Sequence, residues 1–393
     1  MKRLAAFFLA VIMLVLTVYA DDTPQKIEVL PTVTISGADL GINARSCLLM
    51  EEKTGEIMYA QNEHDKCSPA SLSKIMTMLL AFEAIESGKI SLADKVTCSK
   101  AVASKPGSRV FLSENEEITV DELFKCIAVA SGNDAACAMA EHIAGSESAF
   151  VELMNKRAKE LDMNDTEFQN CTGLDEEEGT ENTSTAYDIS IMARELMKHE
   201  KVFDYTTIWT DSIRNGEFQL ANTNKLVRYY SGTTGLKTGS TDKAKYCICA
   251  TAKRDGMHLL AIVMGAQSTS ARTDEAKKLL DYGFANFACV LLKKAPNTGK
   301  VPVLKGKEDF VNSQMTQDDT TLLIGKSEKG EVKYETELFE NITAPVEKGQ
   351  KIGIIKYYVA GREVAQYPLC AERDVERVTF LFNLKNVFKA FLF

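Results

Sequence analysis

Alternating apolar and polar positions predict an antiparallel sheet in the middle of the chain. The runs "TGLKTGS", "KAKYCICATAK" and "MHLLAIVMGAQ" have the length of strands, and Asp255-Gly256 between the last two is a strong hairpin signal. Two shorter apolar runs flank the turn Lys53-Thr54-Gly55 in "SCLLMEEKTGEIMYAQN". Cys247 and Cys249 stand two apart and are predicted to point to one face of their strand. The chain is therefore predicted to contain a three-stranded antiparallel sheet and, earlier, a separate pair of strands joined by a polar turn.

Other apolar positions recur with helical spacing. Residues 75–85 are apolar on nearly every side, as in a buried helix. Residues 120–144 read as two helices broken at Ser131-Gly132-Asn133, and "ARTDEAKKLLDYGFANFACVLL" predicts an amphipathic helix that covers the sheet. Two more helices are predicted in "AFVELMNKRAKELDM" and "STAYDISIMARELMKHE". The acidic segment 164–184 between them is interpreted as a solvated connection.

The first residues have the pattern of an export signal. A basic start is followed by an apolar run, and Val18-Tyr19-Ala20 fits a small-residue cleavage site. The alternative, a membrane-spanning anchor, is disfavoured because roughly 15 apolar residues fall short of the ~20 that cross a bilayer. We therefore expect a signal peptide at 1–20, a polar leader at 21–44 and a protein exported to the outer face of the cytoplasmic membrane.

The last hundred residues differ in character from those before them. A basic segment with Pro and Gly, "KKAPNTGKVP", precedes short alternating strands, which predict a small all-β domain at 300–371. At 376–393, apolar residues share one face of a helical wheel and Asn and Lys share the other. This end is too short and polar to span a bilayer, so it predicts an amphipathic helix lying on the membrane surface. A helix packed on the β domain is the alternative.

Charge and cysteine content narrow the classes of function. The chain has 46 basic and 55 acidic residues, and loss of residues 1–20 would leave 44 against 55, a net charge of −11. Such a surface repels nucleic acid, so no nucleic-acid partner is expected. The ten cysteines lie in apolar surroundings without a C-x-x-C pair, and most are predicted to be buried and free, with one or two disulfides left open. The four histidines are scattered, and no metal or organic cofactor is expected.

Three short motifs carry candidate chemistry. Ser71 and Lys74 are three apart, so on a helix the hydroxyl and the amine lie on one face, where burial favours the neutral amine as a base. Ser131 and Asn133 flank a glycine at the helix break, although such residues also serve as helix caps. Lys237-Thr238-Gly239 is predicted at the end of an edge strand, where an extended peptide can pair. Each motif alone is weak.

In this order, and separated by 60 and 106 residues, the motifs resemble the signature of the penicillin-binding proteins and serine β-lactamases. The chain is most similar to the low-molecular-mass D-alanyl-D-alanine carboxypeptidases, through "GEIMYAQNEHDKCSPASLSKIMT", "ASGNDAACAMAE", "GLKTGSTDKAKYC" and "RTDEAKKLLDYGF". The resemblance implies an α+β fold: a β-lactamase/transpeptidase-like catalytic domain at 45–291, with an antiparallel sheet flanked by helices and a helical subdomain, followed by the small all-β domain. It also makes the second Lys-Thr-Gly the functional copy and the first an ordinary turn.

The resemblance also implies a reaction and roles for the site residues. The family removes the terminal D-alanine from peptidoglycan stem peptides through an acyl-enzyme, and β-lactams acylate the same serine. Ser71 would be the nucleophile, Lys74 the neutral general base, and Ser131 a proton relay to the departing amine. The substrate-binding residues would be Asn133, Lys237, Thr238, Gly239, Ser240 and Arg272.

Within this set, a charged Lys237, Thr238 and Arg272 would hold the terminal carboxylate. The N–H groups of Ser71 and Ser240 would hold the oxyanion. Arg272 could alternatively be a solvated charge. The alternatives are a serine β-lactamase, disfavoured because no E-x-x-L-N type loop is evident, and a non-catalytic penicillin-binding sensor, disfavoured by the intact Ser71 and Lys74.

Overall fold

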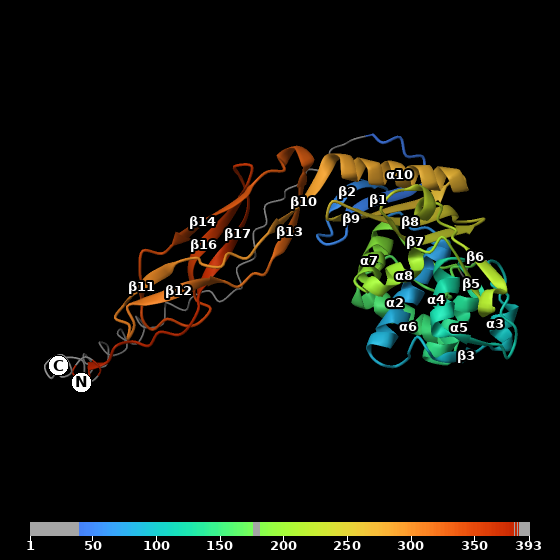
Figure 1. The fold of residues 1–393 in the computed structure, drawn as a ribbon, viewed down its shortest axis with the longest axis horizontal. Coiled ribbons are helices and arrows are strands. Elements are labelled where there is room, and N and C mark those ends of the chain that lie inside the picture. Colours follow the sequence, from blue (N-terminus) through green and yellow to red (C-terminus); the bar gives the residue numbers. More distant parts are fainter. Residues whose placement is uncertain (1–38, 176–180, 381, 383, 385–393) are drawn as a thin grey trace, which may run out of the picture. The chain divides into compact units, whose positions relative to one another are not determined.

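The computed structural model describes residues 39–175 and 181–380, together with 382 and 384 (Figure 1). The predicted signal peptide and most of the leader and of the C-terminal helix lie outside the described residues. Among the residues that are described, no helix is long and apolar enough to cross a membrane. The chain forms two compact units. Among the described residues, the first contains those within 39–293 and 319–331, and the second contains those within 294–318 and 332–384.

An antiparallel five-stranded sheet in the order β2-β1-β9-β8-β7 forms the centre of the first unit. Its strands are β1 (Ser46–Glu51), β2 (Ile57–Gln61), β7 (Thr233–Thr241), β8 (Lys245–Arg254) and β9 (Met257–Ala266). The hairpins expected at Asp255-Gly256 and at Lys53-Thr54-Gly55 are both present. Strand β7, which carries the second Lys-Thr-Gly, lies at the edge of the sheet as predicted.

Both faces of this sheet are buried. Alternate residues of β1 contribute to two cores: Leu48 and Met50 to one, and Cys47 and Leu49 to the other. Helix α10 (Thr269–Asn286) covers the second face, as predicted from its apolar stripe, and the remaining large helices lie on the first (Figure 1). Cys247 and Cys249 both face the helical core, and all ten cysteines are free thiols, as the sequence predicted for most of them.

The helical side of the first unit is built around α2, in which nine of thirteen residues are buried. The large helices on this side are α2 (Lys74–Glu86), α4 (Val120–Ala128), α5 (Asn133–Ala144), α6 (Glu147–Glu160) and α7 (Ala186–Met197). Helix α4 begins with a reciprocal cap between Thr119 and Glu122, which explains the acidic residues expected in its first turn. The predicted break between α4 and α5 is present at residues 129–132.

Shorter elements complete the first unit. They are η1 (Ala70–Ser73), α3 (Lys100–Ser104), η2 (Glu200–Val202), α8 (Phe203–Thr206), η3 (Arg214–Gly216), α9 (Leu226–Tyr229) and η4 (Lys326–Glu328), with the strand pairs β3 (Lys95–Thr97) and β4 (Glu117–Thr119), β5 (Thr210–Ile213) and β6 (Phe218–Ala221), and β10 (Phe287–Leu292) and β13 (Thr320–Gly325). Because β13 pairs with β10, residues 319–331 belong to this unit although they follow part of the second unit in sequence.

The segment between α6 and α7 differs from the solvated connection that its acidic composition suggested. Asn170, Cys171, Thr172 and Asn182 are all buried, and residues 176–180 lie outside the described part. Asn170 Oδ1 accepts hydrogen bonds from the N–H groups of Thr172 and Gly173, at 3.1 and 2.7 Å. Asparagine side chains satisfy the backbone here in place of water, so the segment packs inward.

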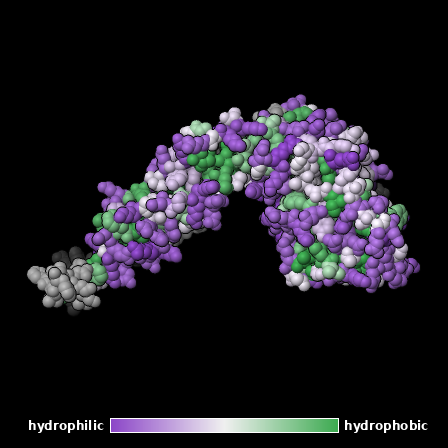
Figure 2. Space-filling model, in the orientation of Figure 1, coloured by the Kyte–Doolittle hydropathy of each residue, from purple (hydrophilic) through white to green (hydrophobic). Residues whose placement is uncertain are grey.

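The second unit is an all-β structure, as the short alternating runs predicted. Its sheet has the order β14-β16-β17-β12-β11-β15. The strands are β11 (Lys300–Leu304), β12 (Phe310–Met315), β14 (Val332–Leu338), β15 (Ile342–Thr343), β16 (Lys351–Val359) and β17 (Arg362–Ala371). Val301, Val311 and Ile352 are completely buried in its core. The visible surface of the protein is mostly hydrophilic, with scattered hydrophobic patches (Figure 2).

Candidate active site

Ser71 and Lys74 meet where the 3-10 turn η1 passes into α2. Lys74 is the first residue of α2 and its side chain has no exposed surface, whereas Ser71 lies in η1 rather than in the α-helix. Lys74 Nζ is 3.0 Å from Ser71 Oγ. The contact expected from the three-residue spacing is therefore present, although the serine precedes the α-helix instead of forming its first turn.

Lys74 has two further hydrogen-bond partners. Its Nζ lies 2.7 Å from Asn133 Oδ1 and 2.8 Å from the carbonyl oxygen of Thr172. A neutral lysine amine has two N–H donors and one lone pair. The two carbonyl-type oxygens can only accept, so they take both N–H groups and leave the lone pair directed at the Ser71 hydroxyl. This arrangement suits an amine that removes a proton from Ser71.

The electrostatics around Lys74 favour the neutral amine. Burial lowers the pKa of Lys74 to about 7, while the nearby Cys171 and Asp134 act in the opposite direction. Lysine in water titrates near 10.4, so at neutral pH a large share of Lys74 is deprotonated. The predicted lowering of this pKa by burial is confirmed.

The turn between α4 and α5 holds Ser131 and Asn133 in fixed positions. Ser131 adopts a left-handed backbone conformation, with φ 61°. The Nδ2 of Asn133 donates to the Pro106 carbonyl at 2.7 Å, which orients its Oδ1 towards Lys74. The buried Asp134 carboxylate accepts the N–H groups of Val110 and Leu112 and ties the turn to the adjoining loop. Both predicted residues therefore do more than cap a helix.

Lys237 approaches the same place from the edge strand β7. Its Nζ is 2.7 Å from Ser131 Oγ and 2.8 Å from its neighbour's carbonyl oxygen, at Thr238. Burial lowers the pKa of Lys237 well below its usual value, and the charges of Lys74 and Arg272 lower it further. The repulsion between the lysines therefore disfavours a positive charge on Lys237 while Lys74 is protonated. A permanent charge on Lys237 does not follow from its position.

The rest of the Lys-Thr-Gly motif lies against the nucleophile. A Cβ on Gly239 would lie only 2.9 Å from the backbone nitrogen of Ser71, so glycine permits β7 to pass this close. Thr238 Oγ1 bonds Thr223 Oγ1 at 2.7 Å, and Ser240 is exposed at the end of the strand. The motif therefore borders the Ser71 site as predicted.

Arg272 is buried, which excludes the solvated charge that its sequence position allowed. Only 6% of the residue is exposed, and Nη1 donates to the carbonyl oxygens of Gly239 at 3.0 Å and Cys247 at 3.4 Å. Among the described residues, its Nε has no hydrogen-bond partner. Arg272 therefore fixes the Gly239 carbonyl oxygen through Nη1, and its Nε is left as an unused hydrogen-bond donor in the described part of the structure.

Sequence reasoning missed the contribution of the segment between α6 and α7. Thr172 supplies a carbonyl to Lys74, and Asn182 Nδ2 donates to Ser73 Oγ at 2.8 Å, beside the nucleophile. The only signal was the Asn-x-Thr-Gly string at 170–173, which is typical of an Asn-centred turn. Over the described residues, no cluster of His, Cys, Asp and Glu could hold a metal ion.

Two known protein families match this chain. Residues 32–268 match the family described as D-alanyl-D-alanine carboxypeptidase, and residues 290–377 match the C-terminal domain of penicillin-binding protein 5. The chain is 41% identical over 353 residues to the D-alanyl-D-alanine carboxypeptidase DacF of Bacillus subtilis, covering 89% of this chain and 90% of the relative.

Solved structures agree with these matches. Penicillin-binding protein 5 from Haemophilus influenzae superposes with a TM-score of 0.74 at 31% identity, over 86% of this chain and 98% of that chain. Penicillin-binding protein D2 from Listeria monocytogenes, solved in its ampicillin-bound form, gives a TM-score of 0.58 at 30% identity, over 63% of this chain and 100% of that one. Together, the two family matches, at residues 32–268 and 290–377, extend over both structural units.

Proposed function

This chain belongs to the D-alanyl-D-alanine carboxypeptidase family, and on that premise we propose that Ser71 is the nucleophile with which it removes the terminal D-alanine from peptidoglycan stem peptides. The observation that carries the assignment is the environment of Lys74. Its Nζ lies 3.0 Å from Ser71 Oγ, and the oxygens of Asn133 and Thr172 accept its other two contacts; in the neutral amine these two oxygens take both N–H groups, which leaves the lone pair for the Ser71 hydroxyl.

Acylation then follows from the geometry. Ser71 Oγ bonds to the carbonyl carbon of the penultimate D-alanine while its proton passes to Lys74 Nζ. The C–N bond breaks, and the proton that Lys74 took from Ser71 passes through Ser131 to the departing amine, which returns Lys74 to its neutral form; Lys237 Nζ contacts Ser131 Oγ and holds it in place. Water afterwards hydrolyses the ester on Ser71 and releases the shortened stem peptide.

The negative charges of the substrate have partners on β7. The N–H groups of Ser71 and Ser240 receive the oxyanion, a role supported by the close approach of Gly239 to the Ser71 nitrogen. Thr238 and Lys237 receive the terminal carboxylate, and Arg272, which bonds to the Gly239 carbonyl oxygen, adds positive charge behind the strand. Asn133 orients Lys74 and lies beside the path of the substrate amide.

β-Lactams are expected to acylate Ser71 as they imitate the D-Ala-D-Ala terminus. A relative of 30% identity was crystallised in an ampicillin-bound form, which supports this extension. No observation favours the alternatives of a β-lactamase or a non-catalytic sensor. Fast turnover of penicillin would indicate the first, and labelling without D-alanine release would indicate the second.

We place the protein on the outer side of the cytoplasmic membrane. The support is its wall-directed family and the export pattern of residues 1–20, with the amphipathic pattern of residues 376–393 as a surface anchor. Phe380, in the part of this segment that the structure describes, is 81% exposed. Fractionation of cells producing the chain with and without residues 379–393 tests the anchor: only the full chain should sediment with membranes.

The nucleophile is tested with Ser71→Ala. This variant should lose covalent labelling by fluorescent penicillin and should release no D-alanine from a peptide ending in D-Ala-D-Ala, because no other group replaces the attacking oxygen. Its melting temperature should stay within a few degrees of wild type. Ser148→Ala, at an exposed serine of α6, is the control and should be labelled normally. Persistent labelling of Ser71→Ala would refute the assignment.

A further inference from the structure

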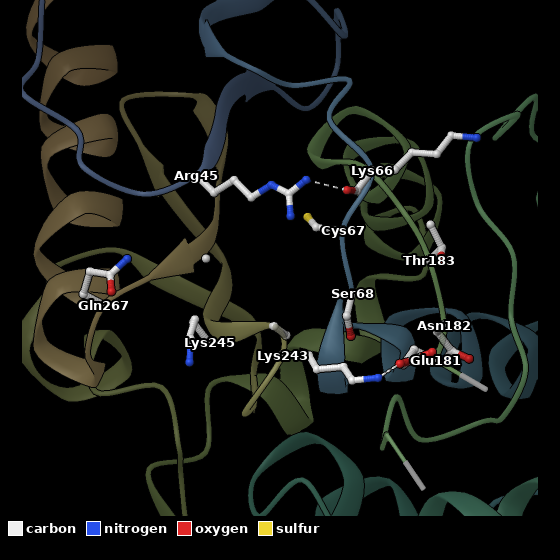
Figure 3. Close-up of a pocket in the computed structure, with 12 residues that line it drawn as sticks. Arg45, Lys66, Cys67, Ser68, Glu181, Asn182, Thr183, Lys243, Lys245 and Gln267 are labelled. Atoms are coloured by element: carbon white, nitrogen blue, oxygen red, sulfur yellow. Dashed lines mark hydrogen bonds and ion pairs between the residues drawn. The ribbon is translucent and has the colours of Figure 1, made fainter. Parts of the chain in front are cut away.

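A basic pocket lies next to the candidate active site in the first unit. It has a volume of about 450 Å³, within the range of ligand pockets, and its lining includes Ser68 and Asn182, close to the nucleophile (Figure 3). Its charged lining residues are Arg45, Lys66, Lys243, Lys245 and Glu181. Four cations against one anion stand out in a chain whose net charge is −9.

The cations differ in whether a carboxylate neutralises them. Lys243 pairs with Glu181, and Lys66 pairs with Asp165 at 2.9 Å, with its ammonium extended away from the other cations (Figure 3). Arg45 donates to the carbonyl oxygen of Lys66 at 2.8 Å. Within the described part of the chain, neither Arg45 nor Lys245 has a carboxylate partner. These two residues therefore supply the uncompensated positive charge.

The backbone around the pocket is shaped to bring Arg45 there. Gly265 of β9 has φ 75°, and a Cβ at this position would lie 2.8 Å from the Cβ of Arg45. Glycine at 265 thus allows Arg45 to pack against the end of β9. Across the pocket, the Lys243–Glu181 pair joins the β7–β8 turn to the segment between α6 and α7 (Figure 3).

The direction of a substrate along β7 leads to this pocket. In the proposed function, the terminal carboxylate lies at Thr238 and the scissile carbonyl at Ser240, so upstream residues continue past Thr241 at roughly 3.3 Å each. A second cavity of about 440 Å³ begins there, with Ser240, Asp242 and Lys245 in its lining. Lys245 and Gln267 line both cavities, so the cavity that begins at Ser240 adjoins the basic pocket.

We propose that the basic pocket is a specificity subsite, in which Arg45 and Lys245 bind a side-chain carboxylate of the stem peptide upstream of the scissile bond. This inference rests on the proposed function, because the direction of the peptide follows from the positions of its carboxylate and scissile carbonyl. Asp242 repels an anion in the second cavity, which places the bound carboxylate in the pocket beyond it.

Matched peptides ending in D-Ala-D-Ala test the subsite. Within each pair, the third or the fourth residue from the end carries either a side-chain carboxylate or the corresponding primary amide. The full-length protein should cleave the acidic member of one pair with a three- to tenfold higher kcat/KM, mainly through KM, as expected for a partly exposed charge pair. Raising the salt concentration should reduce the preference.

Substitutions then assign the preference to the pocket. Lys245→Gln and Arg45→Gln should each reduce the preference for the acidic peptide, and the double substitution should abolish that preference. Lys245→Glu should reverse it, so that the amide peptide is cleaved faster. Lys89→Gln, which removes one exposed lysine after the end of α2, is the matched control and should keep it. Melting temperatures within a few degrees of wild type show that the variants are folded.

The two hypotheses fail in different ways. An enzyme that labels with penicillin and cleaves every peptide without preference, or a preference that survives the double substitution, overturns the subsite and leaves the proposed function standing. A wild-type protein that neither labels nor releases D-alanine overturns the proposed function itself.

Discussion

At the scale of single residues, the chemistry depends on an amine that burial makes easier to deprotonate. Lys74 has no exposed surface, and two oxygen acceptors fix its hydrogens. Burial and these two acceptors prepare Lys74 as a base without the help of a second base. Histidine, the usual base near neutral pH, is therefore unnecessary at this site.

The rate of acylation should follow the titration of Lys74. Because burial lowers the pKa of Lys74 to about 7, the protonated, inactive form dominates below that value and the neutral base above it. The second-order rate constant for penicillin labelling should rise about tenfold per pH unit well below pH 7 and level off above it. Stopped-flow labelling between pH 5 and 8 measures this. A flat profile would exclude Lys74 as the base.

Lys237 should take up a proton when a carboxylate binds. Burial and two nearby cations lower the pKa of Lys237 in the free protein, and an anionic ligand raises that pKa again. Titration calorimetry of Ser71→Ala with a D-Ala-D-Ala peptide should give an enthalpy that depends on the ionisation enthalpy of the buffer, with uptake of up to about one proton. Adding Lys237→Gln should remove this dependence. No dependence in Ser71→Ala itself would mean that Lys237 is already charged.

At the scale of elements, the site requires β7 and the segment between α6 and α7 to approach η1 from two sides. Gly239 allows the first approach and Gly173 the second: a Cβ on Gly173, where φ is 77°, would lie 1.8 Å from the Ala70 carbonyl oxygen. That contact holds the Thr172 carbonyl in reach of Lys74.

Gly173→Ala should therefore displace this segment and weaken the base. We expect at least a tenfold loss in the rate of penicillin labelling, together with a lower melting temperature. Gly88→Ala is the matched control, because Gly88 has φ 71° but no atom within 4 Å of the added Cβ. The control should lose about 1 kcal/mol of stability through its backbone alone and keep its labelling rate. Equal labelling of both variants would contradict the proposed role of the segment.

The sequence predicted the elements of the first unit because their patterns are local. Alternation marked β7, β8 and β9, and helical spacing marked α2 and α10. The Ser71, Ser131 and Lys237 motifs were identifiable because each requires particular side chains. Thr172 was not, since it acts through a backbone carbonyl that any residue supplies. The hydrogen bond from Arg272 to Gly239 was equally hidden, because it depends on how closely α10 packs against β8.

At the scale of the whole molecule, the two units are not consecutive in the chain. The first unit is interrupted after Lys293 and regains Asp319–Glu331, whose strand β13 pairs with β10. Leu323 of β13 is completely buried in the core beneath α10, and Ile324 is 1% exposed. The domain boundary predicted at 291–300 therefore leaves residues 319–331 on the wrong side, because they belong to the first unit.

A chain that ends at Lys293 should be less stable than one that ends at Glu331. The shorter chain lacks Leu323 and Ile324, and burial of two such side chains contributes about 3–6 kcal/mol. Its melting temperature should be lower by at least about 5 °C, measured by circular dichroism. Penicillin labelling at low temperature reports whether Ser71 is still active in each chain. Equal melting temperatures would mean that β13 adds nothing to the first unit.

The return of β13 also fixes an order for biosynthesis. A ribosome makes more than three hundred residues before the partner of β10 leaves the exit tunnel, so the unit that carries Ser71 matures only after translation has entered the region encoding its neighbour. Exchange of the C-terminal region between related genes must consequently preserve the β10–β13 pairing. A crossover just after residue 293 would replace β13, which is part of the core of the first unit, together with the whole second unit.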